Sequence, residues 1–221
     1  MKKMSVIIVI LAMILVSMII YKNIAINKNK SVNVQEVEQI EEYISKIYMW
    51  KEITKEALPT FENINNANEL WVWEVIKKNL ETYETTYEEI QQKGKELFGE
   101  KFERQIPKEG NDSFYYDKES NKYLATEIVL DEEEDSFLLK DIEKEGEKYK
   151  VKIIEYIEDY SEENKVIIRN LQEEEIGRVS TTDSETKIKE IVKNNKERFS
   201  QKNIEIKKEK DNLVIEKVNK E

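Results

Sequence analysis

Residues 137–160 read FLLKDIEKEGEKYKVKIIEYIEDY, two apolar runs separated by a polar turn. In the second run Val151 and Ile153 alternate with lysines, which is the period of a β-strand with one buried face. The next apolar residues, Ile154 and Tyr156, stand on the opposite face of that strand. The pattern predicts a β-hairpin, and we expect a bulge near Ile153 to restore the alternation.

Shorter runs with the same period lie on both sides of this hairpin, bounded by polar turns. They predict antiparallel strands at residues 114–116, 123–130, 166–171, 204–206 and 213–215. The run Asp131–Asp135 between two of these strands fails as a calcium loop, because its sixth and twelfth positions hold Ser136 and Ile142. We interpret it, and Glu173–Glu175, as solvated loop.

Before residue 104 the apolar residues recur at steps of three and four, which predicts helices. One helix is expected from about Val34 to Lys55. A second is expected behind Asn66, where Glu69 completes a capping pair, and it continues for about thirty residues to Gly99. A third is expected behind residue 182.

This order of helices, then strands, then a helix and a hairpin lacks βαβ alternation and indicates an α+β fold. We expect a membrane helix, then two long helices packed on a curved antiparallel sheet, with a third helix and a C-terminal hairpin. The predicted organisation is a membrane anchor at 1–22, a linker at 23–33 and one extracytoplasmic domain at 34–221. A subdivision of that domain near 161–181 is an alternative.

A segment without charged residues runs from Met4 to Tyr21, and all its residues except Ser5 and Ser17 are apolar. Its eighteen residues, at about 1.5 Å each, nearly cross a hydrocarbon core of about 30 Å. We expect a single uncleaved span. The alternative is a cleaved signal peptide, although Asn23 stands where the cleavage site requires a small residue. A short basic tail before the span and a long body after it favour a single-pass protein of the cell membrane whose body lies outside the cytoplasm.

The composition excludes several classes of function. The 221 residues include 36 Lys and Arg, 47 Asp and Glu, and no His or Cys, with a net charge of −11. Disulfides, thiol nucleophiles, Cys/His zinc sites and imidazole-dependent triads are therefore absent. The acidic surface repels phosphate backbones, so we expect no nucleic-acid partner. We find no catalytic motif and expect no enzyme, cofactor or metal.

Four aromatic residues are the candidate contacts for a ligand or partner: Trp71, Trp73, Tyr83 and Tyr87. Aromatic walls with a few polar groups are typical of ligand pockets. The alternative is that Trp73, Tyr83 and Tyr87 are the core side of the long second helix. Trp71 lies off that stripe, so we expect it to be exposed.

The order of elements from Val34 to Tyr160 resembles the cystatin-like or nuclear-transport-factor-two-like α+β domains of exported proteins from low-GC Gram-positive bacteria. The residues that carry the resemblance are Leu97, Phe98 and Gly99 after the helices, Tyr116, Asp117 and Lys118 in the first hairpin, and Ile142, Lys144, Gly146, Tyr149 and Val151 in the second. The resemblance implies a cone of helix and curved sheet that binds small ligands, dimerises or occasionally catalyses. Enzymatic members usually rely on Asp and His, and this chain has no His.

Two functions remain. The first is a membrane-tethered, non-catalytic interaction or scaffold domain, which binds a protein partner or itself, within a cell-envelope, secretion or conjugation assembly. The second is an exported small-ligand binding protein or a carboxylate-dependent hydrolase with a helix–sheet cleft. Two or more buried carboxylates with shifted pKa values in that cleft would favour the second, and a filled apolar interior with an exposed flat face would favour the first.

Overall fold

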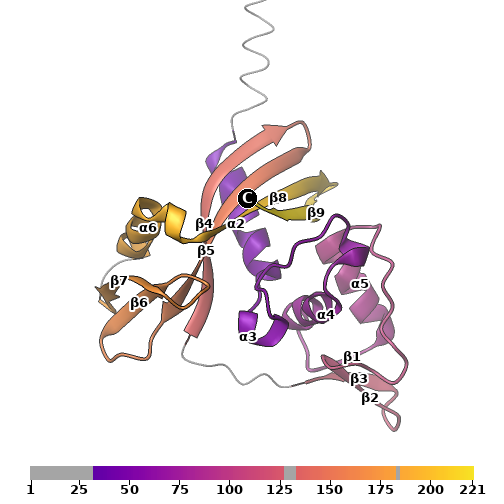
Figure 1. Ribbon diagram of the computed structural model, residues 1–221. Helices are drawn as coiled ribbons and strands as arrows, with labels where there is room; N and C mark the ends of the chain where they lie inside the picture. The colour runs from indigo at the N-terminus through magenta and orange to yellow at the C-terminus, as the bar shows by residue number, and fades with distance from the viewer. Residues whose placement is uncertain (1–31, 127–132, 183–184) are drawn as a thin grey trace, which may run out of the picture.

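The computed structural model describes residues 32–126, 133–182 and 185–221. Within them the fold is α+β, as predicted, with a six-stranded and a three-stranded antiparallel sheet. A long hairpin of β4 (Glu133–Glu145) and β5 (Lys148–Asp159) crosses the middle of the molecule (Figure 1). No helix in these ranges is long and apolar enough to cross a membrane. The predicted span from Met4 to Tyr21 lies outside them.

The larger sheet is built around β5. One edge of β5 pairs with β4, and the other edge pairs first with β8 (Ser200–Glu209) and then with β6 (Lys165–Arg169). The two branches are extended by β9 (Asn212–Lys220) and β7 (Glu175–Ser180). The predicted central and C-terminal hairpins are confirmed. The strand β7 was not predicted, and with β6 it joins the region near 161–181 to this sheet.

The predicted bulge near Ile153 is wrong, because β5 keeps its period of two. The extra residue lies in the partner strand β4, between Leu139 and Asp141. Ile154 and Tyr156 are buried because a second, smaller core covers their face of β5, with Val166 and Ile168 of β6 and with side chains of α6 (Glu185–Asn194). The change of phase therefore marks a strand that is covered on both faces in its second half.

The first predicted helix is shorter than expected. The helix α2 (Val34–Ile47) starts at a capping box of Asn33 and Glu36 and ends before Tyr48. Residues 48–50 are not helical, and the four-residue α3 (Lys51–Thr54) follows. In this break the consecutive residues Tyr48 and Met49 both enter the core.

The second predicted helix is two helices, α4 (Glu69–Lys78) and α5 (Tyr87–Phe98). Between them lies β1 (Glu84–Thr85), which pairs with β3 (Lys122–Ala125), and β3 pairs with β2 (Phe114–Asp117). The predicted cap at Asn66 is wrong, because Asn68 caps α4, and Thr86 with Glu89 forms a capping box at α5. The apolar residues keep one helical phase through both α4 and α5. The chain nevertheless leaves the helix between them, where β1 pairs with β3 and Thr86 caps a new helix.

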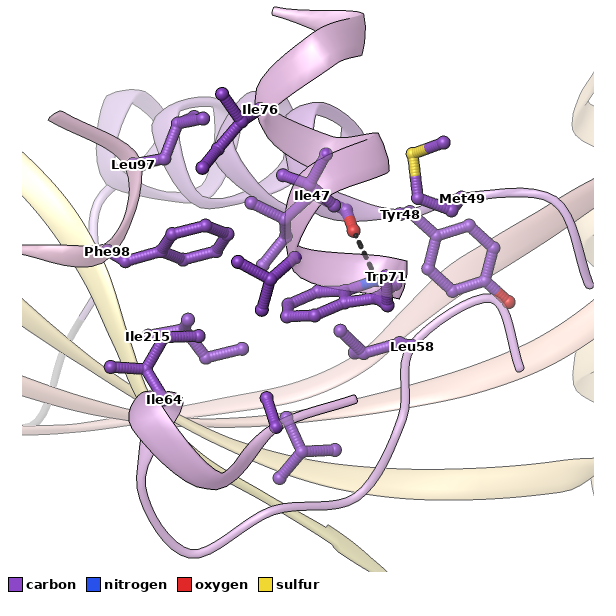
Figure 2. Close-up of a cluster of buried hydrophobic side chains, with 14 of the residues drawn as sticks. Ile47, Tyr48, Met49, Leu58, Ile64, Trp71, Ile76, Leu97, Phe98 and Ile215 are labelled. Carbon is purple, nitrogen blue, oxygen red and sulfur yellow. Dashed lines mark hydrogen bonds between the residues drawn. The ribbon is translucent and has the colours of Figure 1, made fainter. Parts of the chain in front are cut away.

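The main core lies between the helices and the inner face of the sheet. Figure 2 shows Trp71 of α4 in its middle, close to Ile47, Leu58 and Phe98. The Trp71 ring centroid is 5.7 Å from that of Phe98 and 5.8 Å from that of Phe61. Large apolar side chains thus fill the space between helices and sheet.

Candidate functional site

Two of the four predicted contact residues belong to the core. Trp71 is fully buried, and its indole N–H lies 3.1 Å from the carbonyl oxygens of both Ile47 and Ala57. Trp73 is also buried, and its indole N–H donates to Glu69. The expectation that Trp71 is exposed is wrong, because every residue of α4 from 71 to 76 is buried rather than one stripe of it.

The other two predicted residues lie elsewhere. Tyr83 precedes β1 and is 54% exposed. Tyr87 begins α5 and lines an open groove of about 550 Å³ with Tyr116 and Tyr123 of the small sheet. The structure therefore separates the four aromatic residues into two in the core and two near β1, and it does not gather them into one site.

A different cleft has a more specific arrangement of groups. It lies between α2, residues 48–50, the start of β4 and the start of α6, and its volume is about 450 Å³. Its aromatic residues are Tyr48, Trp50, Phe137 and Tyr156. Its carboxylates are Glu41, Glu134, Asp135, Glu158 and Glu185, against two amines, Lys78 and Lys189. We call it the Asp135 cleft.

Asp135 is the buried acid of this cleft, with 8% of its surface exposed. Its Oδ2 accepts the backbone N–H of Lys51 at 2.6 Å, at the first residue of α3. Its Oδ1 is buried and has no hydrogen-bond partner in the part of the chain that the structure describes. Burial raises the pKa of Asp135 to about 6, against the opposing effect of the Lys51 amide.

A buried ion pair lies beside Asp135, where Glu155 of β5 meets Lys202 of β8. Lys202 Nζ lies 3.1 Å from Glu155 Oε1 and also donates to the carbonyl of Leu58. Tyr48 and Ser200 donate their hydroxyls to the Glu155 carboxylate at 3.3 and 3.1 Å. Both oxygens of Glu155 are thus hydrogen-bonded, and its charge is compensated.

The aromatic wall of the cleft already holds an ammonium group. Lys78 Nζ lies 5.3 Å from the centroid of the Trp50 ring and donates to the carbonyls of Ser45 and Tyr48. Across the cleft, the rings of Tyr48 and Phe137 pack with centroids 5.1 Å apart. Aromatic faces attract cations, and more strongly where water is excluded.

Acid–base hydrolysis needs two carboxylates that can exchange protons with a substrate. Asp135 has a free oxygen and a raised pKa, whereas the neighbouring Glu155 is engaged by Lys202 and two hydroxyls. Among the described residues, no three acidic side chains are grouped so that they could hold a metal ion.

Asp135 was missed because it ends the acidic run Asp131–Asp135, which we interpreted as solvated loop. That interpretation is wrong for residues 133–135, which are the first of β4, and residues 131 and 132 lie outside the described ranges. The useful signal was the strand period. Asp135 stands two residues before Phe137 and four before Leu139, on the face whose apolar side chains pack against the main core. Glu173–Glu175 is exposed, as predicted, but Glu175 is the first residue of β7 and not loop.

Comparison with family models, curated proteins and solved structures gave no match for this chain. The resemblance to cystatin-like and nuclear-transport-factor-two-like domains therefore stays a prediction.

The raised pKa of Asp135 predicts a pH-dependent stability. Between about pH 4, where an unfolded aspartate titrates, and pH 6, the folded state holds a proton that the unfolded state has lost. The protonated Asp135 carboxyl stabilises the folded state fully below pH 4, and this stabilisation is lost as the pH rises through 6. Asp135→Asn removes this titration and keeps an acceptor for the Lys51 amide.

We therefore expect Asp135→Asn to gain about 2 kcal/mol of unfolding free energy relative to the wild type as the pH rises from 4 to 7. Urea denaturation of both proteins at intervals of half a pH unit measures this difference. The exposed Asp141 of β4 supplies the control Asp141→Asn. A difference between Asp135→Asn and the wild type that stays constant over this range would contradict the prediction.

Proposed function

We propose that this chain is a non-catalytic interaction domain, tethered outside the cytoplasm by a membrane span at residues 4–21, in a cell-envelope, secretion or conjugation assembly. The observation that carries the proposal is the filled interior. Trp71, Phe98 and Ile215 meet where a cone-shaped enzyme or receptor needs an internal cavity. Binding surfaces of this domain are then external, and the Asp135 cleft is the most structured of them.

The state of the buried acids also supports a role without catalysis. Glu155 is paired with Lys202, and Glu74 of α4 lies 2.7 Å from Lys77. Pairs of this kind hold charge in fixed positions. Asp135, with one free oxygen, favours a ligand-binding role for the cleft, because the buried carboxylate that interacts with it, Glu155, is engaged by Lys202.

The tether is supported by the sequence and by where the folded domain begins. The span at 4–21 carries no charge, and α2 starts at Val34. The linker at 23–33 reaches at most about 40 Å when fully extended. A domain held this close to the lipid is placed to contact other membrane components.

Crosslinking of the full chain in its own cells, followed by identification of the captured species, tests the interaction. We expect a covalent product larger than the monomer with a defined partner or with a second copy. Recovery of the monomer alone would contradict the interaction. Protease added to intact cells tests the orientation, and a body that survives intact while an exposed control protein is cut would contradict it.

A further inference from the structure

The Asp135 cleft contains a carboxylate oxygen that the fold leaves without a partner. Buried polar atoms in folded proteins are nearly always hydrogen-bonded, so an unpaired one requires an explanation. Asp135 Oδ1 is buried and unpaired among the described residues, while Oδ2 of the same group is held by the Lys51 amide. The group is therefore fixed in position with one acceptor available.

Two amines near Asp135 form their ion pairs with other carboxylates. Lys189 lies 2.7 Å from Glu185 and 3.7 Å from Glu41. Lys51 Nζ is shared among Glu52, Glu133 and Glu173. None of the ion pairs within the described ranges includes Asp135. The cleft thus has an excess of negative charge, and its most buried acid makes no ion pair, although the Lys51 ammonium attracts it from a longer distance.

The aromatic wall shows which kind of cation fits. The Trp50 ring already accepts the ammonium group of Lys78 on its face, and Tyr48, Phe137 and Tyr156 supply further rings. A volume of about 450 Å³ lies in the range of ligand pockets and exceeds what one alkylammonium chain fills.

We propose that the Asp135 cleft binds a ligand through a primary ammonium group, with Asp135 as its counter-ion and the aromatic wall around its alkyl chain. This inference rests on the proposed interaction function and names the chemistry of the bound group. A single free oxygen suits the point charge of an ammonium, whereas a guanidinium is best held by both oxygens of a carboxylate. The source is a lysine of a partner protein or a free small amine.

The test uses the full chain in detergent, with its three tryptophan indole N–H groups labelled for NMR. Trp50 lines the cleft, while Trp71 and Trp73 are buried in the main core and serve as internal references. The probes are acetyl-Gly-Lys-Gly-amide, the same peptide with norleucine in place of lysine, and n-butylammonium chloride. We expect the lysine peptide to shift the Trp50 signal saturably and the norleucine peptide to leave it unchanged.

Asp135→Asn is the decisive variant because it keeps the acceptor for the Lys51 amide. We expect it to weaken binding of the lysine peptide by about tenfold or more, since one partner of a desolvated charge pair is lost. Glu205→Gln, on β8 away from the cleft, removes the same charge from the domain and should leave affinity unchanged. Equal weakening by both variants would mean non-specific attraction to an acidic protein and would overturn the inference.

The pH dependence is a second readout. Besides Asp135, the titratable groups that interact with it are Tyr48, Lys51, Glu52 and Glu155. The other charged groups that line the cleft are Glu41, Lys78, Glu134, Glu158, Glu185 and Lys189. Wild-type affinity should fall as the pH decreases from 7.5 to 5, with a midpoint near 6, and the affinity of Asp135→Asn should lack this transition. The same profile for both proteins would overturn the inference.

The two probes separate the sources of the ammonium group. Tighter binding of the lysine peptide than of n-butylammonium assigns the cleft to a partner protein, and equal binding assigns it to a small amine. Saturable probe binding with only monomer in the crosslinking experiment would reject the proposed function and keep the ammonium site. A captured partner without any Trp50 response would keep the interaction function and reject the site.

Discussion

Lys202→Met is expected to lower the free energy of unfolding by about 3–5 kcal/mol at neutral pH. Both members of the Lys202–Glu155 pair are desolvated, with 2% and 0% of their side chains exposed. The substitution keeps most of the lysine's aliphatic volume and removes the positive charge. Glu155 then stays buried without its cation, and Leu58 loses the donor to its carbonyl oxygen. Urea denaturation followed by far-UV circular dichroism measures the loss.

Two variants test the physical reason for this effect. Glu155→Gln combined with Lys202→Met removes both charges, retains an acceptor for Tyr48 and Ser200, and should recover most of the lost stability. Lys152→Met, on the solvated face of β5 and paired with Glu221, should change stability little. If Lys202→Met costs no more than Lys152→Met, the buried pair does not have the role argued for it.

Trp71→Ala is expected to cost about 3–5 kcal/mol, because the largest side chain in the middle of the main core is replaced by a methyl group. The contacts with Phe61 and Phe98 are lost, and two buried carbonyls lose their shared donor. The same denaturation measurement applies.

The conservative variant Trp71→Phe keeps part of the packing and removes the hydrogen bonds. It retains a ring against Phe98 and loses the indole N–H together with part of the ring volume, so its cost should be smaller than that of alanine. Tyr115→Ala serves as the exposed control, since 62% of Tyr115 is accessible. A loss for Trp71→Ala as small as that for Tyr115→Ala would contradict the placement of Trp71 in the core. It would also restore the earlier interpretation of Trp71 as a contact residue.

The aromatic candidates illustrate how periodicity misleads when elements are short. Trp73, Tyr83 and Tyr87 fall in one helical phase, yet the chain leaves the helix after Lys78 and resumes it at Tyr87. The pairing of β1 with β3 joins residues about forty positions apart. Local phase contains no information about such a contact, so the split between α4 and α5 could not be derived from it.

The amino-acid sequence alone determined the α+β class, the central hairpin, the C-terminal hairpin and the start of α2, because alternation, turns and caps act between residues close along the chain. The tertiary structure decided which faces are covered. It buried part of the second face of β5 beneath α6, placed Trp71 inside the core, and paired Glu155 with Lys202. It also set the start of β4 against α3, which desolvates Asp135. Burial depends on which distant parts of the chain pack against a residue. The sequence of an acidic run therefore does not show whether its last residue is solvated or buried.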